Sequence, residues 1–86
     1  MNRREILEAA TQAVTVDRAA THGNAEDGFA LIAAYWSSHL DVNVTATDVA
    51  VMMCLLKLAR IKANPSHPDS FIDVAGYAAC GGEIAT

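Results

Sequence analysis

The sequence has few residues of the kinds that form covalent or metal-based sites. Its two cysteines, Cys54 and Cys80, lack CxxC spacing and lie in apolar segments, so we expect buried core residues rather than a disulfide or metal ligands. The three histidines, His22, His39 and His67, do not have the HExxH spacing of a zinc enzyme. The sequence also has no GxSxG elbow, phosphate-binding loop or dinucleotide fingerprint. These absences argue against zinc enzymes, serine hydrolases and P-loop or Rossmann proteins.

Positive charge and long apolar runs are also scarce. Six Lys and Arg residues against ten Asp and Glu give a net charge of −4. Binding to DNA phosphates needs a clustered positive face, so we expect no direct DNA binding. The longest apolar run, residues 49–56, is far shorter than the roughly 20 residues that span a bilayer, and the polar start MNRREILEAA is unlike a secretory signal. We therefore expect a soluble intracellular protein with no membrane association.

Apolar residues, in contrast, make up 52% of the 86 residues, a high share for so short a chain. A chain of this length fits a single helical domain, residues 1–86, and buries only about 60–65% of its unfolded surface. We therefore expect a second copy to cover part of the apolar surface, most simply in a twofold homodimer.

Apolar residues recur at helical spacing, and strand-like alternation is absent, so the sequence predicts an all-α fold. Four helices are expected, at residues 2–20, 25–40, 48–62 and 69–80. The third is apolar on every side between residues 49 and 56. We therefore expect it to be the buried central helix of a compact four-helix bundle that dimerisation completes.

Polar residues and glycines mark the ends of these helices. The expected N-caps are Asn2, Asn24, and either Thr45 or Thr47. The fourth helix is expected to end at Gly81 and Gly82.

Charged residues of opposite sign fall on the facing sides of the third and fourth helices. Lys57 and Arg60 are three residues apart and share one face of the third helix. Asp69, Asp73 and Tyr77 follow at four-residue spacing on the fourth. Antiparallel packing about the short loop between the helices places Lys57 opposite Asp73. These five residues form the candidate site.

The cluster has two interpretations. In the structural one, Lys57 and Arg60 pair with Asp73 and Asp69 to satisfy charges in an apolar hairpin, with little net stabilisation. In the functional one, the two cations hold a phosphate, while the aspartates orient a base or a hydrated Mg²⁺. Mg²⁺ is then the one cofactor to consider, with Asp69 and Asp73 as its ligands. His22, in a turn, can donate to the same ligand or be solvated.

Four motifs mark the chain between residues 18 and 79. They are R-x-x-x-[YH]-G from Arg18, F-x-x-I-A-x-x-W from Phe29, D-V-A-x-M-M-x-x-L-K-x-A-R from Asp48, and D-S-x-x-D-x-A-G-Y from Asp69. Together they resemble a family of small bacteriophage and prophage helical proteins of unknown function. The K-x-x-R and D-x-x-x-D parts are also distantly similar to phage proteins associated with nucleotide modification and to MazG-type all-α nucleotide pyrophosphatases. The resemblance implies a helical oligomer that handles nucleotides in the cytoplasm of a bacterial host.

The acidic residues depart from the pyrophosphatase pattern. MazG-type enzymes bind magnesium with an E-x-x-E pair and an E-x-x-D pair, whereas this chain has Glu26 with Asp27 and Asp69 with Asp73. The resemblance therefore implies a binding protein without complete catalytic machinery more than a pyrophosphatase-like hydrolase.

Two functional hypotheses follow. The first is an accessory protein that binds a nucleotide or other phosphorylated small molecule. The alternative is a non-enzymatic interaction protein that binds a host factor, such as an inhibitor of a host defence complex. A structural component of the phage particle would be a third class, but no sequence feature points to it.

Overall fold

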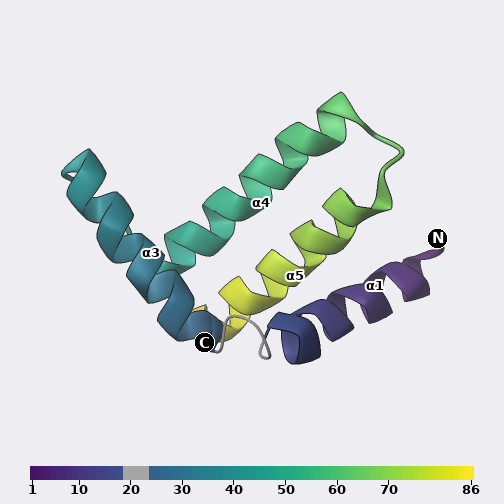
Figure 1. The fold of residues 1–86 in the computed structure, drawn as a ribbon, viewed down its shortest axis with the longest axis horizontal. Coiled ribbons are helices and arrows are strands. Elements are labelled where there is room, and N and C mark those ends of the chain that lie inside the picture. The colour runs from purple at the N-terminus through teal and green to yellow at the C-terminus, as the bar shows by residue number, and fades with distance from the viewer. Residues whose placement is uncertain (19–23) are drawn as a thin grey trace.

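The four predicted helices are present in the computed structural model, which describes residues 1–18 and 24–86 (Figure 1). They are α1 (Arg3–Gln12), α3 (Ala25–Leu40), α4 (Ala46–Ala63) and α5 (Pro68–Ala85), and the short π-helix η1 (Ala13–Asp17) continues α1. No strand occurs in these described residues, so the all-α prediction is confirmed. Within the same ranges, no helix is long and apolar enough to cross a membrane.

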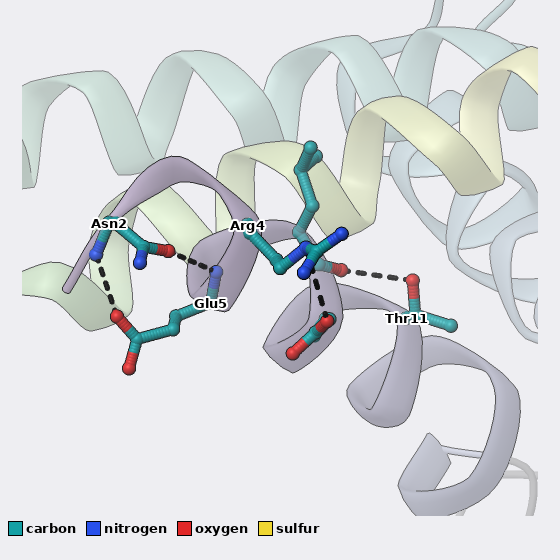
Figure 2. A network of polar contacts seen from close by, with 6 residues as sticks. Asn2, Arg4, Glu5 and Thr11 are labelled. Atoms are coloured by element: carbon teal, nitrogen blue, oxygen red, sulfur yellow. Dashed lines mark hydrogen bonds and ion pairs between the residues drawn. The ribbon is translucent and has the colours of Figure 1, made fainter.

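Side-chain caps begin α1, α3 and α4 where the sequence predicts them. The Asn2 side chain accepts a hydrogen bond from the Glu5 amide at 2.8 Å, and the Glu5 carboxylate accepts one from the Asn2 amide at 3.0 Å (Figure 2). Thr45 and Asp48 form the same reciprocal capping box at α4, so Thr45 is the cap of the two candidates. Asn24 accepts hydrogen bonds from two amides in the first turn of α3. These bonds satisfy amides that a helix start otherwise leaves unpaired.

The end of the first helix departs from regular α geometry. Its last turn, Ala13–Asp17, is a π-helix, whose wider turn pairs residues five apart. The Thr11 hydroxyl donates to the Leu7 carbonyl at 2.9 Å (Figure 2), and the Thr15 hydroxyl donates to the Thr11 carbonyl at 2.6 Å. Such back-bonding bends helices, and here it immediately precedes and enters the π turn. The predicted end at residue 20 lies outside the described residues.

The other helices pack around α5 (Figure 1). α4 runs antiparallel to α5 after a short turn, and α1 with η1 lies along the other side of α5. α3 packs against the beginning of α4 and the C-terminal part of α5. The buried core residues that connect these helices are Phe29, Ala33, Val49, Ala50 and Cys80.

The helix predicted to be buried at the centre is exposed along most of its length. In α4 only Val49 and Ala50 are buried, both near its start. The exposed large apolar side chains of α4 are Val51, Met52, Leu55, Leu56 and Leu58. The prediction was wrong for a single chain because α5, not α4, occupies the centre. An apolar helix sequence does not specify how many of its sides the same chain covers.

The glycines expected to end the fourth helix lie inside it, since α5 continues to Ala85. Gly81 is buried, and a Cβ atom built on it would lie 2.9 Å from the Ala50 Cβ. Gly81 therefore allows α4 and α5 to approach closely, and tertiary packing overrides the local stop signal. Gly82 has no such neighbour within 4 Å.

Candidate functional site

Lys57 and Asp73 meet across the α4–α5 hairpin, as their spacing predicts. The Lys57 Nζ lies 2.9 Å from the Asp73 Oδ2, and the two side chains are 17% and 40% exposed. Desolvation offsets much of the attraction in such a pair, but removing one partner leaves a partly buried charge. The short contact between the two charged groups holds the Asp73 carboxylate beside Lys57.

Arg60 and Asp69 do not extend this pair into the expected second one. The Asp69 Oδ2 lies 3.4 Å from the His67 Nε2, where both side chains are more than half exposed. α5 begins only one residue before Asp69, so its N-cap residue His67 is the nearer partner. Arg60 is exposed on α4, and no ion pair of its side chain occurs within residues 1–18 and 24–86.

A hollow of about 280 Å³ lies between η1 and α5. Asp73 and Tyr77 of the predicted site line it. The other lining residues are Ala13, Val14, Asp17, Arg18, Ile72, Gly76 and Cys80. The hollow is close in volume to the smallest sites that hold small-molecule ligands, and its walls combine apolar surface with a few polar groups, as such sites do.

Arg18 is the one basic residue among the described residues that line this hollow, and the predicted set lacks both it and the acidic Asp17. Its guanidinium carbon lies 4.7 Å from the centroid of the Phe29 ring, a cation–π contact, and the Phe29 ring in turn lies 6.2 Å from the Tyr77 ring. The Arg18 Nε is buried and has no hydrogen-bond partner among the described residues. A buried donor without a partner costs about 1–3 kcal/mol. The only sequence signal for Arg18 was its position at the start of the first motif.

The acidic residues of the hairpin fit a magnesium ion poorly. Asp73 faces Lys57 and Asp69 faces His67, whereas Mg²⁺ needs carboxylate oxygens arranged around one point. In the described part of the chain, no three His, Cys, Asp or Glu side chains gather as a metal site would require. His22 lies outside the described residues.

Both cysteine thiols are free, and the predicted burial in the core is confirmed for Cys80 but only in part for Cys54. Cys80 is buried, and Cys54 is half-buried with its Sγ 3.7 Å from the Val74 carbonyl oxygen. Burial raises the pKa of both thiols, so their nucleophilic thiolate forms are less populated near neutral pH.

A second hollow, of about 480 Å³, lies on another side of the α1–α5 contact. The charged residues that line it are Glu26 and Glu83, and the remainder of its described lining is neutral. The first hollow also has two carboxylates, Asp17 and Asp73, but it includes a cation, Arg18, and is therefore the better match for an anionic ligand.

Comparison with known proteins places the chain among phage proteins. A family model described as "Domain of unknown function (DUF6378)" matches residues 5–85. The chain is 40% identical over 75 residues to the Gene 55 protein of Mycobacterium phage D29, which covers 87% of this chain and 50% of that protein. It is 42% identical over 74 residues to the Gene 55 protein of Mycobacterium phage L5, which covers 85% of this chain and 47% of that protein. The chain thus spans about half the length of these curated relatives.

No solved structure matches the chain. The matches support the resemblance to phage proteins of unknown function. The distant similarity to MazG-type pyrophosphatases stays a prediction.

Proposed function

This chain is a phage protein that belongs to the DUF6378 family, and we propose that it is an accessory protein that binds a nucleotide or another phosphorylated small molecule. The observation that carries the proposal is the hollow between η1 and α5, in which Arg18 lies beside Asp73 and Tyr77. In this proposal the protein acts in the cytoplasm of the bacterial host and lacks complete catalytic machinery.

Arg18 supplies the anion-binding group of the proposed site. A guanidinium carries a permanent charge and a planar set of donors that match phosphate oxygens. Its contact with the Phe29 ring holds it in position, and its unpaired Nε would gain an acceptor from a bound anion. A lysine at this position would lack the planar donor set.

The rest of the hollow suits the uncharged part of such a ligand. Ala13, Val14 and Ile72 offer apolar surface for a base or sugar. The Asp73 carboxylate, held by Lys57, can accept hydrogen bonds from base or ribose donors. Tyr77 contributes a ring and a hydroxyl that can donate or accept.

Arg60 and Asp69 belong to the outer part of the proposed site. Both are exposed, and neither lines the hollow. A ligand with a longer phosphate chain can extend out of the hollow, and Arg60 is the exposed cation one turn from Lys57 on α4. We therefore expect Arg60 to matter more for triphosphates than for monophosphates.

Binding without hydrolysis is supported by the arrangement of the carboxylates. Phosphoryl and pyrophosphoryl chemistry depends on metal ions that neutralise developing charge. Of the candidate magnesium ligands, Asp73 faces the Lys57 ammonium group and Asp69 faces the His67 imidazole. If the chain is an enzyme after all, the activity to assay is nucleotide pyrophosphatase-like hydrolysis.

A thermal-shift screen of the purified chain against nucleoside mono-, di- and triphosphates, with and without Mg²⁺, tests the proposal. A ligand at 100 times its dissociation constant adds about 2.7 kcal/mol, which raises the melting temperature of so small a domain by about 10 °C or more. We expect Arg18→Gln to abolish the shift and Arg60→Ala to weaken it most for triphosphates. Arg4→Gln, on the exposed outer side of α1, is the matched control and should leave the shift unchanged.

Two outcomes would contradict this function. A ligand-induced shift that survives Arg18→Gln would mean that the ligand binds elsewhere. The absence of a shift with every nucleotide would favour the alternative function, a non-enzymatic protein that binds a host factor such as a component of a defence complex.

The observation that favours the alternative is a pair of exposed residues on α3. Leu31 and Tyr35, one helical turn apart, are 54% and 66% exposed. Exposed aromatic and aliphatic side chains on one helix face are typical anchors of protein interfaces. A pull-down from host lysate that captures a protein with the wild type, but not with Tyr35→Ala, would support it.

We further propose that the protein is a homodimer. The core of one chain is small, and large apolar side chains remain exposed on α1, α3 and α4. A second copy would cover part of this surface.

A further inference from the structure

The surface of the chain is larger than that of an ordinary monomer of its mass. The chain exposes 5876 Å², whereas a folded monomer of 9.1 kDa is expected to expose about 4,900 Å². The Cα radius of gyration is 13.4 Å, against about 12 Å for a typical domain of this length. The excess of about 1,000 Å² is close to the area that each partner buries in a standard protein–protein interface, about 800 Å².

The exposed apolar surface is continuous along one side of α4. Val51, Leu55 and Leu58 follow at four- and three-residue spacing, and Met52 and Leu56 lie in the adjacent row. These five residues, which we call the outer face of α4, are between 39% and 59% exposed. The opposite side of α4 faces α5, with Ala50 buried and Lys57 paired to Asp73.

The charges at the two ends of this face are complementary under a twofold rotation. Asp48 and Lys62 are each seven residues from Leu55, almost two helical turns, so both lie on the same side of α4 as Leu55. Both are exposed. At a rise of 1.5 Å per residue they stand about 10 Å from Leu55 in opposite directions. When two copies of α4 pack antiparallel about a twofold axis at Leu55, Asp48 therefore faces Lys62 of the partner subunit at both ends.

We propose that the outer face of α4 is the interface of a twofold homodimer, in which two α4 helices pack antiparallel about Leu55. This inference rests on the homodimer proposed above and specifies its interface. A twofold interface is self-complementary, and this face meets that requirement with an apolar centre and one charge of each sign at equal distances from it. Parallel, in-register packing would instead place Asp48 beside its own copy. The ligand hollow borders η1 on α5 and includes no residue of this face, so both copies keep their sites accessible.

Sedimentation velocity of the wild type and of two glutamate variants tests the interface. We expect the wild type to sediment as a dimer and Leu55→Glu, which places two carboxylates at the twofold axis, to sediment as a monomer. Leu31→Glu makes the same substitution at a similarly exposed leucine on α3 and should remain a dimer.

A charge reversal tests the antiparallel arrangement without changing the apolar centre. Lys62→Glu should raise the dimer dissociation constant several-fold at low salt, because it faces Asp48 of the partner subunit. Adding Asp48→Asn should restore part of the affinity, because it removes the repulsion between the two carboxylates. The cap of α4 is kept, since the amide oxygen can still accept the hydrogen bond from the Thr45 amide. Arg4→Glu, a charge reversal on α1, should leave the dissociation constant unchanged.

The outcomes separate the proposals. A monomeric wild type would overturn both the homodimer and its interface. A dimer that persists in Leu55→Glu would overturn only the interface, and a dissociation constant unaffected by Lys62→Glu would overturn the antiparallel arrangement. If Leu55→Glu loses its helical circular dichroism, the Lys62→Glu pair decides the question. Nucleotide binding is tested separately, by Arg18→Gln, so failure of one proposal does not imply failure of the other.

Discussion

At the scale of single residues, Asp48 links the charge state of the chain to the stability of α4. Its carboxylate accepts a hydrogen bond from the Thr45 amide at 2.9 Å, and its own amide donates to the Thr45 hydroxyl at 3.1 Å. The backbone hydrogen bond, followed by the side-chain one, lowers the pKa of Asp48 below its ordinary value of 3.8. Because the pKa is lower in the folded state, the carboxylate stabilises the fold fully above that ordinary value. This contribution is lost as the pH falls through the lowered pKa.

We therefore expect Asp48→Asn to lower the melting temperature near neutral pH, and the difference from the wild type to shrink as the pH falls below 3.8. Thermal unfolding followed by circular dichroism measures the melting temperatures of the wild type and the variant at each pH. Glu8→Gln is the control, because the Glu8 carboxylate lies as far as 3.9 Å from the Arg4 guanidinium in a largely exposed pair and should contribute little at any pH. A difference that stays constant with pH would show that the charge of Asp48 is not the cause.

The candidate site also shows which residues the sequence can and cannot identify. The Lys57–Asp73 pair was predictable because a short loop forces α4 and α5 to pack antiparallel, which fixes their register. The expected Arg60–Asp69 pair does not form, because the start of α5 offers Asp69 a nearer partner in His67. Arg18 was missed because its position depends on the π turn before it and on the Phe29 ring of another helix.

At the scale of elements, local signals predicted where helices begin and failed where tertiary packing intervenes. Capping by Asn2, Asn24 and Thr45 involves residues within one turn, so the sequence contains all the information needed. The stop expected at Gly81 and Gly82 failed because contact with α4 stabilises the helix beyond them. The position of α5 at the centre was not predictable either, since it depends on which helix has neighbours on several sides.

The two adjacent glycines of α5 provide a matched prediction. Gly82→Ala should stabilise the chain by about 0.5–1 kcal/mol, because alanine favours helix and nothing lies within 4 Å of the added methyl group. Gly81→Ala gains the same propensity but places its Cβ 2.9 Å from the Ala50 Cβ. Overpacking of this kind costs about 1–3 kcal/mol, so the net effect should be destabilising. Urea unfolding at one fixed protein concentration measures both, and equal effects at the two positions would contradict the close contact between α4 and α5.

At the scale of the whole molecule, the two proposed surfaces lie on different sides of α5. The hollow with Arg18 lies between α5 and η1, whereas the outer face of α4 points away from α5. The chain combines 52% apolar residues with a small core, and the proposed dimer would cover part of this excess of apolar surface. The same excess explains why the sequence suggested a fully buried α4. Its composition is that of a helix covered on all sides, but one chain covers only one side.

The proposed dimerisation through the outer face of α4 predicts that the stability of the fold depends on protein concentration. If folding and dimerisation are coupled, each tenfold increase in concentration stabilises the dimer by about 1.4 kcal/mol, and the melting temperature rises with it. We expect this rise in the wild type and in Arg18→Gln, and its loss in Leu55→Glu, measured by circular dichroism over a hundredfold range of concentration. Arg18→Gln is the informative control because it changes the hollow and leaves α4 intact. A wild-type melting temperature independent of concentration would mean that one chain is stable with its outer face of α4 exposed, and the apolar surface would then have to serve another partner.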